Sequence, residues 1–176
     1  KPDFFVIEGE GGHARFTPHD GLERELEAYL LKQQCHVSIE NVISGPGLET
    51  IYCFLCDRAG VKAKLTSAAE IGAEALEGVE LPRKAALLLL NALASVIVDN
   101  MLTMGCWRGA VITGGVVPKL STLIHESDFK ERIQSSGKLR KILKEIPVWL
   151  STDPMSGIVG AQSALSNSFL RAKLVL

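Results

Sequence analysis

The sequence has no excess of charge of one sign, few cysteines and none of the common catalytic signatures. Its 19 lysine and arginine residues nearly balance 20 acidic residues, and the net charge of -1 gives no field that would attract nucleic acid or an anionic membrane. Four cysteines scattered among 176 residues argue against a secreted disulfide scaffold, so we expect reduced thiols and a cytoplasmic location. The motifs of serine hydrolases, zinc proteases and P-loop proteins are also missing.

Long hydrophobic runs are missing as well. The most apolar run, "AALLLLNALASVIV" at residues 85–98, is too short to span a bilayer and ends at Asp99, so we expect a buried helix and no membrane partner. The start of the chain, "KPDFFVIEGE", turns acidic where a signal peptide would stay apolar. Because the first residue is Lys1 and not methionine, we expect a fragment or a processed product.

Hydrophobic periodicity and helix-end signals predict a mainly helical chain. Asp20 and the Ser67/Glu70 pair are typical N-terminal caps, and Gly105 fits a helix end. Gly45-Pro46-Gly47 is interpreted as a breaker that ends one element before the next helix. The predicted helices span residues 21–34, 48–60, 66–78 and 81–105, with short helical pieces over 117–127, 128–137 and 138–146 and a last helix over 156–172.

Short runs of β-branched and other apolar residues predict a few strands between these helices. The predicted strands span residues 3–8, 108–115 and 147–152, and the first two are expected to be buried. Strands spaced between helices indicate an α/β layered fold with some parallel pairing. No linker, internal repeat or low-complexity segment divides the chain, so we predict one domain over residues 1–176.

Two glycine-rich turns are candidates for ligand binding. "GEGGHARF" at residues 9–16 places Glu10 and His13 among three glycines, which is typical of a loop that approaches a ligand but also of a tight turn with two solvated side chains. "AVITGGVVPKL" places Gly114 and Gly115 between a strand and a helix. Free backbone N–H groups there would suit a phosphate or a nucleotide, and an ordinary strand-to-helix turn is the alternative.

Cys53 and Cys56 form a C-x-x-C pattern that invites zinc and redox interpretations. The pattern lies inside a predicted helix, where residues three apart share a face, and no second cysteine or histidine pair follows at zinc-finger spacing. We therefore predict that both cysteines pack in the core and that the chain holds no structural metal.

Four segments together resemble the C-terminal part of bacterial-type glucokinase: "GEGGHARF", "HVSIENVISGPGLETIY", "AVITGGVVPKL" and "FKERIQSSGKLRKILKEIPVWL". The resemblance covers nearly the whole chain and keeps the order of the motifs. It implies a ribonuclease-H-like fold of two lobes, shared with hexokinase and actin, in which sugar and ATP lie in the cleft between the lobes. This chain resembles the large lobe only, an α/β unit with a mixed sheet and flanking helices.

The resemblance also implies roles for particular residues. Glu10, His13 and Glu40 match the side chains that bind the hydroxyls of glucose, and Gly114 and Gly115 match the segment that lies along the adenosine of ATP. Carboxylates accept hydrogen bonds while a histidine can donate or accept, which suits a ring of hydroxyls. The implied reaction is phosphoryl transfer from ATP, with Mg2+, to the 6-hydroxyl of glucose.

Three family segments are missing from this sequence: the Asp-x-Gly-Gly-Thr and Gly-Thr-Gly phosphate segments, and the Asn-Asp pair whose aspartate is the catalytic base. We therefore expect the base in a missing N-terminal lobe, and we expect this chain alone to be inactive. Because members of the family are often dimers, a homodimer is one expected assembly. The alternative function is a non-catalytic sugar-sensing or assembly module derived from a sugar kinase.

Overall fold

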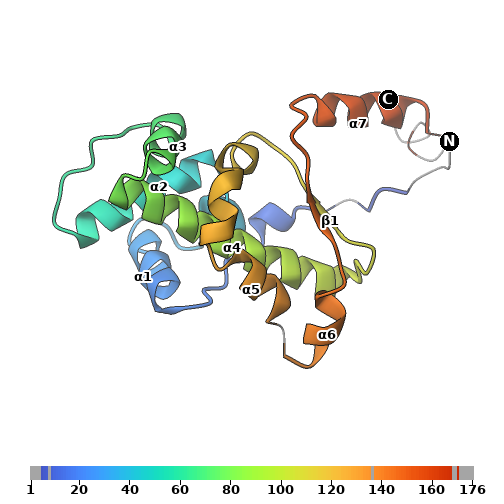
Figure 1. The fold of residues 1–176 in the computed structure, drawn as a ribbon, viewed down its shortest axis with the longest axis horizontal. Helices are drawn as coiled ribbons and strands as arrows, with labels where there is room; N and C mark the ends of the chain where they lie inside the picture. Colours follow the sequence, from blue (N-terminus) through green and yellow to red (C-terminus); the bar gives the residue numbers. More distant parts are fainter. Residues whose placement is uncertain (1–4, 8, 136, 168–169, 171–176) are drawn as a thin grey trace.

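A long central helix organises the structure (Figure 1), a computed structural model that describes residues 5–7, 9–135, 137–167 and 170. This helix, α4 (Glu80–Met104), has eleven buried residues among its 25. It packs against α2 (Gly45–Arg58), α3 (Ala68–Leu76), α5 (Phe129–Gln134) and the 3-10 helix η3 (Val117–Glu126). The burial predicted from its apolar sequence is confirmed, because a helix that is apolar on most sides needs neighbours on most sides.

Most of the predicted helix ends are confirmed. Asp20 caps α1 (Gly21–Leu30) by accepting a hydrogen bond from the first turn, and Ser67 and Glu70 form a capping box at the start of α3. The short pieces predicted after residue 117 are η3, α5, η4 (Gly137–Leu139) and α6 (Arg140–Leu143). By length and composition α4 is the one helix in the described residues able to cross a membrane, but 56% of its most apolar window is buried inside the protein.

The prediction that Gly45-Pro46-Gly47 separates one element from the next helix was wrong, because these residues form the first turn of α2. Ser44 is the N-cap residue, and its hydroxyl accepts a hydrogen bond from the Gly47 N–H at 2.9 Å. Proline fits this turn because the first N–H groups of a helix have no partner within the helix. The breaker signal and the helix-start signal therefore come from the same residues.

The sheet is smaller and more exposed than predicted. It consists, within the described residues, of β1 (Ala110–Ile112) and β2 (Val148–Leu150), which pair in parallel with Val111 opposite Trp149. The parallel pairing is confirmed, whereas a mixed sheet is not found in this part of the chain. Ile112 is 9% exposed, but Val111 and Trp149 are 63% and 51% exposed, so only one face of the sheet is covered.

The two ends of the described chain also differ from the prediction. Residues 5–7 form no strand, and Phe5 and Ile7 are 75% and 70% exposed, while residues 3, 4 and 8 of the predicted strand lie outside the described residues. The last helix, predicted over residues 156–172, is confirmed as α7 over Ser156–Leu165, which has no buried residue, while residues 168, 169, 171 and 172 lie outside the described residues. Figure 1 shows α7 away from the helices around α4.

A buried ion network joins α1 to α5 and was not predicted. The Arg132 guanidinium, 5% exposed, donates hydrogen bonds to Asp20 at 2.6 Å and to the fully buried Glu23. Burial alone would raise the pKa of Asp20, but the backbone hydrogen bond from Glu23 and the charge of Arg132 lower it overall. Glu23 shares the buried face of α1 with Leu26 and Leu30. This helical spacing was the signal in the sequence that could have predicted the burial of Glu23.

Candidate functional site

A short antiparallel contact brings the two halves of the predicted sugar site together. The 3-10 turns η1 (Gly11–His13) and η2 (Ile39–Asn41) flank a bridge between Arg15 and Ser38. Backbone hydrogen bonds of 2.9 Å run from Phe16 N–H to the Val37 carbonyl and from the Ile39 N–H to the Ala14 carbonyl. Because Phe16 and Val37 are fully buried in the core, the two turns are anchored at the protein surface.

The predicted sugar ligands Glu10, His13 and Glu40 meet at this surface. His13 lies between the two carboxylates, with Nε2 3.9 Å from Glu10 Oε2 and Nδ1 3.9 Å from Glu40 Oε2. These distances are too long for direct hydrogen bonds, so each polar group keeps capacity for another partner. The side chains are 61% to 88% exposed, and the cluster is therefore open to solvent on one side.

The glycines around this cluster are not required by the packing of the chain itself. A Cβ atom on Gly9 or Gly11 would meet nothing within 4 Å, and one on Gly12 would lie 3.8 Å from the Glu40 Cβ, an ordinary contact. Neither Gly11 nor Gly12 has a positive φ. Their missing side chains leave the backbone of the turn bare toward solvent.

The η2 turn that carries Glu40 is held from both ends. The Asn41 carboxamide oxygen accepts hydrogen bonds from the Ser38 N–H, at 2.8 Å, and the Ser38 hydroxyl, at 2.9 Å. On the other side, the Ser44 hydroxyl donates to the Glu40 carbonyl at 2.7 Å. A Cβ atom on Gly47 would lie 2.3 Å from the Val42 carbonyl oxygen, so only glycine fits where α2 begins against η2.

The predicted nucleotide glycines border a separate groove of about 580 Å³. Gly115 lines it, while Gly114 lies beside it in the chain with φ +118°, a conformation that favours glycine. The other walls come from the start of α2, from α3 and from η3, with one cation, Lys119. The lining of α3 consists of small or apolar residues at helical spacing: Ala68, Ala69, Gly72, Ala73 and Leu76. That small-residue pattern was visible in the sequence but was not recognised.

The first turn of α2 connects the sugar cluster to this groove. Ser44, its cap, binds the Glu40 carbonyl, while Leu48, four residues later, lines the groove. Gly45 faces α3 closely enough that an added Cβ would lie 3.7 Å from the Ala68 Cβ. One helical turn thus contacts both Glu40 and the residues that line the groove.

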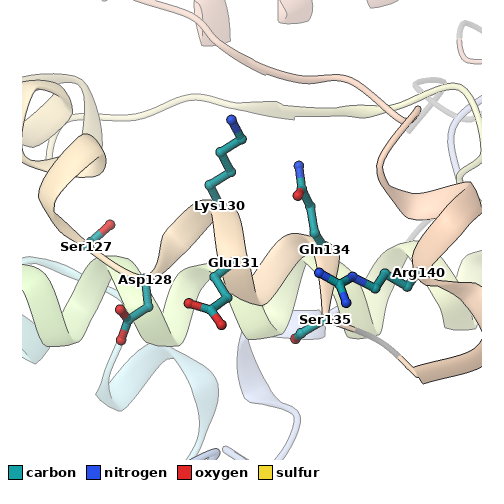
Figure 2. A pocket seen from close by; sticks show the side chains of 7 residues that line it. All are labelled: Ser127, Asp128, Lys130, Glu131, Gln134, Ser135 and Arg140. Carbon is teal, nitrogen blue, oxygen red and sulfur yellow. The ribbon is translucent and has the colours of Figure 1, made fainter.

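A second hollow, of about 460 Å³, lies on α5 and contains none of the predicted site residues (Figure 2). Charges of both signs line it, and Figure 2 shows Lys130 extending away from Asp128 and Glu131. Asp128 already accepts a hydrogen bond from Asn91 at 3.3 Å, which ties α5 to α4. This polar hollow has no apolar wall for a ring and fits a solvated surface.

Cys53 and Cys56 behave mainly as packing residues. Cys56 is 1% exposed, as predicted, whereas Cys53 is only half-buried. Burial, with nearby Cys56, Asp57 and Glu49, raises the pKa of the Cys53 thiol and so disfavours the thiolate needed for metal binding or redox chemistry. Among the described residues, no group of three or more histidine, cysteine or acidic side chains is placed to hold a metal.

Comparison with known proteins places the chain in a family. The family model described as glucokinase matches residues 1–168. The chain belongs to the glucokinase family. It is 39% identical to the glucokinase of Zymomonas mobilis over 170 residues, which cover 94% of this chain and 51% of that protein. The chain thus spans about half the length of the curated glucokinases it matches.

Solved glucokinase structures have the same arrangement of elements. The glucokinase from an Antarctic psychrotroph matches 93% of this chain with a TM-score of 0.84 and 32% identity, and the match covers 51% of that chain. The glucokinase from Balamuthia mandrillaris, solved in complex with glucose, matches 86% of this chain with a TM-score of 0.73. At 21% identity, the second comparison supports the fold alone.

We expect Gly47→Ala to destabilise the protein by about 1–3 kcal/mol, because the new methyl group would overlap the Val42 carbonyl. Gly45→Ala is the matched control in the same helical turn, where the added Cβ makes only an ordinary contact with Ala68. Urea unfolding of both variants measures the difference. Equal stability of the two variants would contradict the close approach of α2 to η2.

Proposed function

We propose that this chain is part of an ATP-dependent glucokinase and supplies the glucose-binding side chains together with one wall of the nucleotide site. The observation that carries the proposal is the meeting of Glu10, His13 and Glu40 on two separate turns in a chain of the glucokinase family. The parent reaction is phosphoryl transfer from ATP to the 6-hydroxyl of glucose, in which positioning and charge stabilisation do most of the work.

The chemistry of the cluster suits a sugar. Two carboxylates provide acceptors, and the imidazole between them provides a donor or an acceptor, so adjacent hydroxyls can each find a partner. Hydrogen bonds to ionised acceptors contribute about 1.5–3 kcal/mol each. The bare backbone at Gly11 and Gly12 leaves room for the sugar ring to approach the turn.

The groove beside Gly115 suits the adenosine of ATP. Its volume lies within the range of small-molecule sites, and the small side chains of α3 leave space for a flat base. Lys119 offers a positive charge at the groove for a nucleotide that carries phosphates. The described residues form no metal cluster, and the proposed role of this chain includes no protein ligand for Mg2+.

The rest of the site would come from another lobe, since the chain spans about half of the glucokinases it matches. We assign this chain to the large lobe of a ribonuclease-H-like pair. The exposed apolar face of the sheet, with Val111 and Trp149, and the exposed residues Ile158 and Val159 of α7 would then pack against the remaining polypeptide. Parallel sheets are normally covered on both faces, so the exposed face of this two-stranded sheet is a surface that further structure would cover.

We expect the chain alone to show no glucose phosphorylation and to gain it when coexpressed with the part of Z. mobilis glucokinase that it does not match. Trp149→Asp should prevent copurification of the two parts, because it places a charge in the apolar face, while Val61→Asp, at another exposed apolar position, should not. A coupled ADP-release assay measures turnover. Formation of a stable but inactive complex would favour the non-catalytic sugar-sensing or assembly module.

In that complex, we expect Glu10→Gln and Glu40→Gln to lower kcat/KM for glucose by about 10- to 150-fold, because each replaces a charged acceptor with a neutral amide. The KM for ATP should change much less. Glu131→Gln, in the polar hollow on α5, is the control for a neutralised surface carboxylate. If Glu131→Gln lowers the activity and Glu10→Gln does not, the sugar does not bind at the η1 turn.

We expect Ala73→Leu to weaken nucleotide binding at least about tenfold, because the larger side chain fills the groove from an exposed position of α3. Glucose binding should be unchanged. Ala28→Leu, an exposed alanine on α1 away from the groove, is the matched control. Calorimetric titration with ATP and with glucose measures both affinities. An unchanged affinity for ATP in Ala73→Leu would show that the nucleotide does not bind in the groove.

A further inference from the structure

A histidine outside the cluster contacts the backbone of the turn that carries His13. His36 Nε2 lies 3.2 Å from the His13 carbonyl oxygen, although the two residues are 23 positions apart in the sequence. The ring reaches across from the strand-like segment that contains Val37 and Ser38, next to the backbone bridge already described. His36 is itself exposed, so this contact is not a consequence of core packing.

The turn has few other attachments. Its own hydrogen bonds, from His13 N–H to the Glu10 carbonyl at 2.9 Å and from Ala14 N–H to the Gly11 carbonyl at 3.2 Å, lie within the turn. Glu10 makes no side-chain capping bond, and the glycines contribute no side chains. Within the described residues, the contact from His36 is the hydrogen bond that fastens residues 10–13 to another segment.

We propose that His36 is a positioning residue for the sugar-binding turn, an inference that rests on the proposed function. A carbonyl oxygen only accepts, so His36 Nε2 carries the hydrogen and donates it to the His13 carbonyl. This contact holds His13 between Glu10 and Glu40 before the sugar arrives, so binding costs less ordering of the turn. His36 touches no reacting group and acts only through the orientation of His13.

Three substitutions distinguish the effect of the His36 hydrogen bond from the effect of its side-chain volume. Glutamine places its amide nitrogen near the position of histidine Nε2, asparagine places its own nearer to Nδ1, and leucine keeps the volume without a donor. In the coexpressed complex, His36→Leu and His36→Asn should raise the dissociation constant for glucose about three- to tenfold, and His36→Gln should stay within about twofold of wild type. The thermal midpoint should stay unchanged in all three, because the side chain is exposed.

A second measurement uses the 176-residue chain without sugar and so does not depend on the proposed function. Long-range ¹H–¹⁵N spectra should show the hydrogen of His36 on Nε2, and ¹⁵N relaxation should show larger motion at Gly11, Gly12 and His13 in His36→Leu than in wild type or His36→Gln. An Nδ1–H tautomer, or a turn equally ordered in all variants, would overturn the positioning role. Absence of glucose binding in the wild-type complex would overturn the proposed function, and the relaxation data would still decide the role of His36.

Discussion

The burial of α4 is the constraint on which the rest of the described structure depends. Its apolar surface extends around most of the helix, and the hydrophobic effect, at about 1.5–3 kcal/mol for each fully buried large side chain, favours neighbours on every side. α2, α3, α5 and η3 all pack against it, and the positions of α2 and α3 are therefore set by the core. The groove beside Gly115 lies at the surface of α2, α3 and η3, whose buried residues belong to that core.

The first turn of α2 connects the core to the residues proposed to bind the ligands. Its cap, Ser44, binds the backbone of Glu40, and Leu48 forms part of the groove beside Gly115. Phosphoryl transfer depends on holding two substrates in a fixed relation, because the rate falls steeply when the reacting atoms are misplaced. A single helical turn shared by the sugar cluster and the nucleotide groove would supply that fixed relation in the proposed glucokinase.

The chain exposes apolar strand residues that a complete sheet would bury. The strand sequences around Val111 and Trp149 have the β-branched and aromatic character of buried strands, and yet both side chains are about half exposed or more. The prediction of a buried strand over residues 108–115 was correct in the type of element, but Val111 lies on an exposed face of that strand. Burial depends on what covers a strand, and this chain spans about half of the related glucokinases.

The sequence by itself determined the features that depend on near neighbours along the chain. The capping box that begins with Ser67 and the left-handed Gly105 that ends α4 involve residues within one helical turn, so their spacing was sufficient to predict them. The family resemblance supplied the candidate residues and their expected roles. Only the tertiary structure decided that Glu23 is buried against an arginine more than 100 positions away, and that Glu40 lies beside His13. Those contacts arise from packing between distant segments, and no local pattern of residues specifies which distant segment a surface will meet.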